Sequence, residues 1–240
     1  MPQHLRHVVL GALCATAVVG LAACSSTAST TAGAPAATST AAKGAAQTDP
    51  NAGLQTGTKL ETMLLPASAV PSSLKLDPAD SRNTGAVFSE PSTATVSKAQ
   101  ACTALGATSW INAAGIDSGS FAQNDYDDSY DDMFAQEVDS FRGANATTVM
   151  ANLQHVFTEC KTFKTTQSGS TYTEQLTWKS LPGVGDQAME AVITSPALDG
   201  GTTLVAVRVG NLVATTLDND QNTTGSAGVA LTERLAKNLG

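Results

Sequence analysis

The spacing of apolar residues predicts three helices. One covers residues 145–161, another covers residues 95–111 with Thr95 or Ser97 as its N-cap, and a third covers residues 226–239. The first is the clearest, because its apolar residues form one stripe at helical spacing: Val149, Met150, Leu153, Val156, Phe157 and Cys160. These helices each offer one apolar face to a core.

Strands are predicted where the apolar period changes to two. Tyr172, Leu176 and Trp178 alternate with polar residues, which is typical of a half-buried strand with both aromatic rings on its buried face. Residues 188–194 and 202–209 predict two further strands, with "LDGG" as the turn between them. Gly210 and Asn211 form a two-residue connection to a following strand, and glycine in the first position suits a type II′ hairpin.

Residues 119–142 predict two strands joined through "NDYDDSYDD". A helix over residues 133–141 is the alternative, because Met133, Phe134, Val138 and Phe141 also fit helical spacing. Strands joined by hairpins and followed by helices indicate an α+β domain with an antiparallel sheet packed against helices.

The N-terminal residues 1–23 have the pattern of a signal peptide. An apolar run of 16 residues, Val8 to Ala23, follows a short polar start and is too short for a permanent membrane span, which needs roughly 20 residues. Leu21, Ala22, Ala23 and Cys24 resemble the lipobox of bacterial lipoproteins, which implies lipidation of Cys24 with fatty acyl chains such as palmitate. A plain secreted protein with an incidental cysteine is the alternative. The lipoprotein interpretation predicts an anchor on the extracytoplasmic face of the cell membrane.

Residues 24–57 are predicted to be the lipidated cysteine and a disordered tether. They are rich in Ala, Ser, Thr and Gly, and Leu54 is their one large aliphatic residue, so they cannot form a core of their own. A flexible chain of this length reaches roughly 30 Å. One folded domain is expected from residue 58 to residue 240.

Charge and cysteine content limit the partners and cofactors. Loss of Arg6 with the signal peptide leaves 12 basic and 21 acidic residues, a net charge of −9, which argues against nucleic acid as a partner. Loss of Cys14 and lipidation of Cys24 leave Cys102 and Cys160, and an isolated pair in an oxidising compartment predicts a disulfide. The sequence predicts no cofactor and no metal centre.

An acidic stretch contains the candidate ligand or cation contacts: Asp125, Tyr126, Asp127, Asp128, Tyr130 and Asp131. The stretch lacks the central glycine and the terminal glutamate of an EF-hand loop. The alternative interpretation of this stretch is an acidic hairpin tip that is kept soluble by its charge.

His155, the one histidine after the signal peptide, falls nearly opposite the apolar stripe of its helix and is expected on the surface. The glycines of "LPGVGD" precede a strand, which predicts a turn rather than a phosphate-binding loop.

Several motifs occur in an order that resembles a known family: "LLPASAVP", Cys102 in an early helix, "VDSFRG", a helix ending at Cys160, "LPGVGDQAMEAV" and "VRVGNLVA". This order is similar to the extracellular PknH-like sensor domains of actinobacterial serine/threonine kinases and their free-standing lipoprotein relatives. The resemblance covers roughly residues 59–240. It implies an antiparallel sheet flanked by helices around a cleft that binds an extracellular ligand. That family's kinase-borne sensor carries two disulfides, whereas this chain has cysteines for one.

The sequence therefore predicts a non-catalytic lipoprotein whose domain binds an envelope small molecule or a partner protein. An accessory or structural lipoprotein that recruits another envelope protein is the first alternative, and a cell-wall hydrolase is the second. The acidic side chains needed for hydrolysis are present, but no nucleophile or zinc motif accompanies them.

Overall fold

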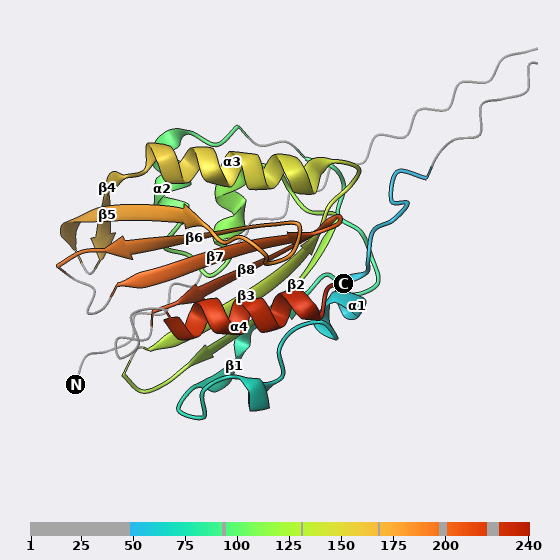
Figure 1. Cartoon of the computed structure of the whole chain (residues 1–240), viewed down its shortest axis with the longest axis horizontal. Helices are drawn as coiled ribbons and strands as arrows, with labels where there is room; N and C mark the ends of the chain where they lie inside the picture. Colours follow the sequence, from blue (N-terminus) through green and yellow to red (C-terminus); the bar gives the residue numbers. More distant parts are fainter. Residues whose placement is uncertain (1–48, 93–94, 131, 168, 197–200, 220–225) are drawn as a thin grey trace, which may run out of the picture. The chain divides into compact units, whose positions relative to one another are not determined.

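The core of the domain is one antiparallel sheet of eight strands in the order β1-β2-β3-β8-β7-β6-β5-β4 (Figure 1). The computed structural model describes residues 49–92, 95–130, 132–167, 169–196, 201–219 and 226–240. The strands are β1 (Lys75–Asn83), β2 (Ser120–Asp127), β3 (Met133–Ser140), β4 (Thr162–Gln167), β5 (Ser170–Ser180), β6 (Gln187–Thr194), β7 (Thr202–Val209) and β8 (Leu212–Asp218). The α+β class with an antiparallel sheet is confirmed.

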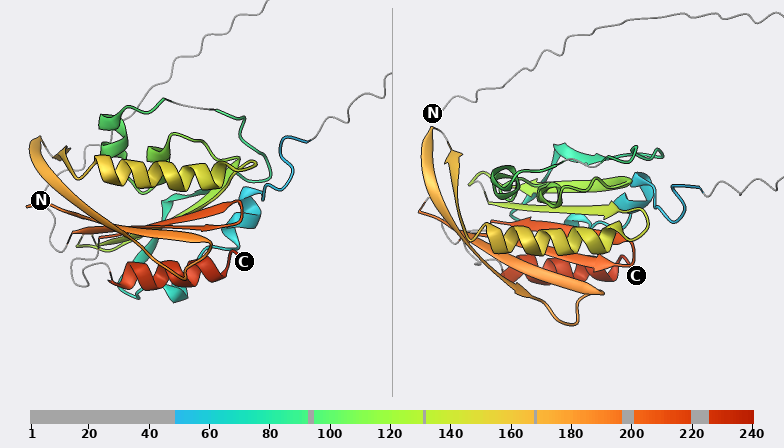
Figure 2. Two further views of the ribbon diagram at one scale, coloured as in Figure 1. Left: turned by 45° about the horizontal axis from the view of Figure 1, so that its top comes forward. Right: turned by 90° about the horizontal axis from the view of Figure 1, so that it is seen from above.

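Helices cover both faces of this sheet, so the domain has three layers (Figure 2). They are α1 (Gly57–Glu61), α2 (Lys98–Ala104), α3 (Asn145–Glu159) and α4 (Ser226–Lys237), with 3₁₀ turns η1 (Ala67–Ala69) and η2 (Trp110–Ala114). The first face, beneath α2, η2 and α3, carries the largest apolar cluster. The second face packs against α1 and α4 and carries the other two.

The predicted helix over residues 145–161 is α3, and the whole predicted stripe from Val149 to Cys160 is buried. Its Phe157 ring lies 5.8 Å from the ring of Trp110 in η2, centroid to centroid. The stripe therefore joins the sheet to the layer above it.

Both predicted hairpins are present. Strands β2 and β3 pair from Ser120 with Ser140 to Asp127 with Met133, so the helical alternative over residues 133–141 is wrong. Apolar residues of β3 are buried on both faces of the sheet, which explains why its pattern also fitted a helix. Strands β7 and β8 meet at Val209 and Leu212, and Gly210 has the positive φ of 61° that the tight connection requires.

The helix predicted over residues 95–111 is shorter than expected and is followed by a separate 3₁₀ turn. Ser97 is its N-cap and forms a capping box with Gln100, and the helix ends at Ala104. Turns and a bend follow at residues 105–109, and Trp110 then enters the core, where its indole N–H donates to the Thr216 carbonyl at 3.2 Å.

The folded domain begins before the predicted boundary at residue 58. The Leu54 side chain packs beside Gly119, the Gln55 N–H donates to the Ser140 hydroxyl at 3.1 Å, and Arg142 donates to the Asn51 side-chain oxygen at 2.8 Å. Residues 49–57 thus belong to the domain rather than to a tether. The predicted signal peptide, Cys24, residues 25–48 and most of the "LDGG" turn lie outside the described residues.

Two strands were not expected from the sequence, and both lie at the edges of the sheet. The first edge, β1, contains Pro78 and shifts register between Asp77 and Arg82, and the other edge, β4, is mostly polar. Edge strands have one partner and an open side, so they lack the alternation that marks a half-buried strand.

Within the described residues, no helix is long and apolar enough to cross a membrane.

Candidate ligand-binding pocket

A pocket of about 430 Å³ opens at one end of the first sheet face, between β4 and the chain that follows α2. Its floor is apolar and comes from four strands. Phe163, Ile193, Leu217 and Met133 reach it from β4, β6, β8 and β3. Such a volume with apolar walls is typical of a small-molecule site.

Glu174 is the charged residue of this pocket. It lies on β5, opposite Phe163 of β4, and its side chain is only 4% exposed. One carboxylate oxygen accepts a hydrogen bond from the Thr165 hydroxyl at 2.6 Å. The other, Oε2, is buried and has no hydrogen-bond partner among the described residues. A buried carboxylate oxygen without a partner is energetically costly, so its retention requires an explanation.

The roof of the pocket is formed by residues 103–108, which are held to the sheet by hydrogen bonds. The Gln123 side chain on β2 donates to the Thr108 hydroxyl at 2.9 Å and to Asp125 at 2.8 Å. Its amide oxygen accepts from Ser109 at 2.7 Å and from Arg82 on β1 at 3.1 Å. The roof therefore rests on a fixed polar network rather than on a free loop.

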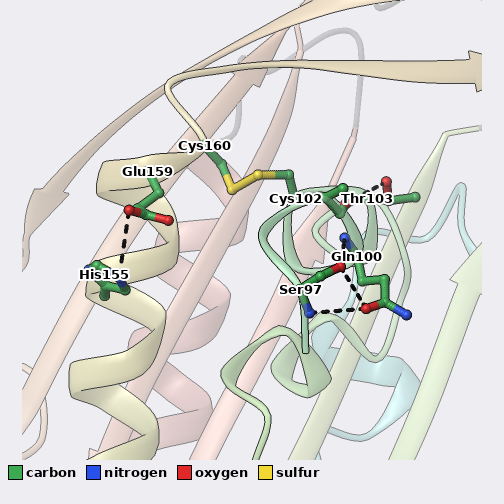
Figure 3. Close-up of a disulfide and its surroundings, with 8 residues drawn as sticks. Ser97, Gln100, Cys102, Thr103, His155, Glu159 and Cys160 are labelled. Atoms are coloured by element: carbon green, nitrogen blue, oxygen red, sulfur yellow. Dashed lines mark hydrogen bonds and ion pairs between the residues drawn. A yellow bond between two sulfur atoms is a disulfide. The ribbon is translucent and has the colours of Figure 1, made fainter. Parts of the chain in front are cut away.

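The predicted disulfide between Cys102 and Cys160 is present and joins α2 to the end of α3 (Figure 3). Cys102 immediately precedes Thr103 of the roof, and Cys160 lies at the end of α3, just before the β4 strand that carries Phe163. The Cα atoms are 5.5 Å apart. The cross-link thus fixes α2 against the start of β4.

A pair of buried acids lies on the same sheet face, beneath the chain that enters η2. Glu137 and Asp139 are two residues apart on β3 and are both buried, and one oxygen of each lacks a hydrogen-bond partner among the described residues. Burial raises the pKa of Asp139 to about 7. Burial, followed by repulsion from Asp139, raises the pKa of Glu137 well above its usual range. The pair therefore retains a proton where exposed acids would have lost it.

The predicted acidic stretch is a hairpin tip, and the structure does not bring its residues into one site. Asp125 and Tyr126 are buried on opposite faces of β2. Burial, partly offset by the Gln123 hydrogen bond, raises the pKa of Asp125. Tyr126 instead donates its hydroxyl to the Leu65 carbonyl at 3.3 Å.

The remaining residues of this stretch lie near the tip of the hairpin. Asp127 and Tyr130 are exposed, Asp128 accepts hydrogen bonds from the backbone of the turn, and Asp131 lies outside the described residues. Over the described part of the chain, no three acidic, histidine or cysteine side chains are grouped to hold a metal ion.

A second pocket of about 340 Å³ lies between α2, η2 and α3. Lys98, His155 and Glu159 line it, and the His155 side chain is 73% exposed, as the sequence predicted. Its Nε2 atom lies 3.8 Å from a Glu159 oxygen. The polar side chains of this pocket are in contact with solvent, so they do not need a ligand to satisfy them. The pocket that contains Glu174 is therefore the stronger candidate.

The sequence predicted the strand β5 but gave no role to Glu174, the acid of the pocket. Leu176 is buried and Trp178 and Tyr172 are partly buried on the predicted face of β5. Glu174 shares that face, since alternate residues of a strand point the same way. An acid within an alternating apolar series was the available signal. The "LPGVGD" segment is a turn, as predicted, with positive φ at Gly183 and Gly185.

The fold defines a class: a single antiparallel sheet covered by helices on both faces and closed by a C-terminal helix. This architecture is also found in an extracellular domain of known structure. The chain is similar to the crystal structure of the extracellular domain of PknH from Mycobacterium tuberculosis, with a TM-score of 0.53 and 14% sequence identity over 78% of this chain and 97% of that one. The PknH-like fold expected from the motif order is confirmed. No family model and no curated protein matches the sequence.

Proposed function

We propose that the protein is an extracytoplasmic lipoprotein whose α+β domain binds a small molecule of the cell envelope and does not catalyse a reaction. The binding site is the 430 Å³ pocket that contains Glu174. The pocket carries the proposal, because it combines apolar walls with one buried, incompletely bonded carboxylate, Glu174. The fold shared with the extracellular domain of PknH supports an extracytoplasmic location.

The lipobox-like pattern before Cys24 supports the membrane anchor. Two or three acyl chains on one cysteine bind stably to a bilayer, whereas a single chain binds only marginally. Mass spectrometry of the membrane fraction tests the anchor and should find acylated Cys24. Release of Cys24→Ala into the medium is expected, and unchanged cell association of this variant would contradict the anchor.

Ligand binding is tested by native mass spectrometry of the protein purified from its own membranes without refolding. Gly106→Trp is the informative variant. Gly106 lines the pocket with a backbone that accepts a side chain, since an added Cβ would meet nothing nearer than the Thr103 carbonyl oxygen at 3.7 Å. A tryptophan there should fill the pocket mouth.

The expected result is a bound small molecule in the wild type and its loss in Gly106→Trp. Val87→Trp is the control, because Val87 is exposed and lies outside the pocket lining. This control should retain the bound mass. Equal retention by both variants would place the binding elsewhere and contradict the proposal.

A further inference from the structure

We infer that the pocket selects organic cations: molecules with an apolar body and a protonated amine that pairs with Glu174. This inference rests on the proposed function and specifies its ligand class. Three observations support it: the apolar floor of the pocket, the buried carboxylate of Glu174, and the lack of an ion pair between Glu174 and any lysine or arginine of the described residues.

One oxygen of the Glu174 carboxylate is hydrogen-bonded within the domain, and the other, which is buried, is not. The Thr165 hydroxyl occupies only Oε1, and Oε2 is left without a donor among the described residues. Two acids nearby do have cationic partners: Glu190 on β6 is 2.9 Å from the Lys179 ammonium, and Asp186 in the turn before β6 is 3.0 Å from the Arg208 guanidinium. No described lysine or arginine forms an ion pair with Glu174.

A ligand cation would satisfy this oxygen better than a neutral group. A hydrogen bond between an ammonium and a carboxylate is about twice as strong as a neutral one, and it strengthens when water is excluded. The net charge of the chain, −8, also attracts cations. A carboxylate or phosphate ligand would instead place two negative charges together in a largely buried site.

The rest of the pocket fits the apolar body of such a ligand. Phe163 and Ile193 lie on the strands that flank β5, and Leu217 and Met133 extend the apolar floor away from Glu174. The 430 Å³ volume is large enough for a ring system but not for a folded peptide. The polar end of a ligand would therefore lie at β5 and its apolar end toward β3.

Three compact probes that differ in one group test the inference: 1-aminoadamantane, 1-adamantanol and 1-adamantanecarboxylate. Binding to the intact protein is measured by calorimetry or by ligand-observed NMR. We expect the amine to bind about tenfold or more tightly than either analogue, as one charge-assisted hydrogen bond implies. Equal or tighter binding of the alcohol or the carboxylate would overturn the inference.

Glu174→Gln keeps the side-chain shape and removes the charge, so it should abolish the preference for the amine. Glu190→Gln is the matched control, because Glu190 is an acid of the adjacent strand β6 that points to the other sheet face. That control should keep the preference. A preference that survives in Glu174→Gln contradicts the role of Glu174.

The two proposals fail in different ways. If no probe binds at millimolar concentration but the native ligand is still lost in Gly106→Trp, the cation class is wrong and pocket binding stands. If the amine binds equally well to Gly106→Trp, it does not occupy this pocket, and the inference is wrong with it.

Discussion

Cys102 and Cys160 form a disulfide that links the helix before the roof of the pocket to the end of α3, just before β4. Their sequence separation of 58 residues makes the cross-link a strong constraint on the unfolded chain. Replacing both cysteines by alanine should lower the free energy of unfolding by about 4 kcal/mol in the chain-entropy model. Urea denaturation measures this loss.

Reductant provides the control for that experiment. Dithiothreitol should destabilise the wild type and leave the double alanine variant unchanged. Equal stability of the two proteins without reductant would show that the disulfide does not stabilise the domain.

The buried pair of Glu137 and Asp139 predicts a stability that falls as pH rises. The pKa of Asp139 is about 7 in the folded protein and about 3.9 in the unfolded chain. Between these values the folded state binds more protons, so its stability is full below pH 4 and is lost as pH rises through 7. Asp139→Asn should remove this part of the dependence, which amounts to a few kcal/mol at most.

Denaturation midpoints at pH 4 to 8 check this prediction through the difference between wild type and variant. Asp127→Asn is the control, since Asp127 is exposed at the end of the neighbouring strand β2. Its profile should follow that of the wild type. If the stability of Asp139→Asn changed with pH as that of the wild type does, Asp139 would be ionised in the folded protein throughout this range.

The two glycines of the turn before β6 predict unequal costs of substitution. Gly183 and Gly185 both have positive φ, so alanine is strained at each by about 1–2 kcal/mol. At Gly185 an added Cβ would also lie 2.6 Å from the Arg208 carbonyl oxygen, whereas at Gly183 it meets nothing within 4 Å. Gly185→Ala should therefore lower the thermal midpoint more than Gly183→Ala. Equal shifts would contradict the close approach of the turn to β7.

The start of the domain before residue 58 can be tested by truncation. A chain that begins at Thr58 loses the contacts of Asn51, Leu54 and Gln55 with β2, β3 and Arg142. It should be less stable by about 1 kcal/mol or more than a chain that begins at Gln47. Equal unfolding curves would show that residues 49–57 do not stabilise the domain.

Periodicity in the sequence predicted the elements that bury one clear face. The α3 stripe and the hairpins of β2 with β3 and β7 with β8 follow from residues that stand next to one another in the chain. The edge strands β1 and β4 lack such a face and were missed. Their place in the sheet depends on partners that are far away in the sequence.

The cysteines of the sequence predicted the disulfide, but nothing in the sequence predicted the pocket. Glutamate and aspartate are usually exposed to solvent. The three-dimensional fold shows that Glu174, Glu137 and Asp139 are buried. The acidic stretch attracted attention because its charge is dense, yet Asp125 and Tyr126 lie on opposite faces of β2 and the other described residues of the stretch lie near the hairpin tip. Burial, rather than charge density, distinguishes the candidate site.

The most direct test of the account is a crystal structure of the protein purified from its membranes without refolding. We expect density for a small molecule in the pocket, with a donor atom within hydrogen-bonding distance of Glu174 Oε2 and an apolar part against Phe163 and Leu217. A pocket filled only by water, with Glu174 Oε2 bonded to a group of the protein itself, would contradict it.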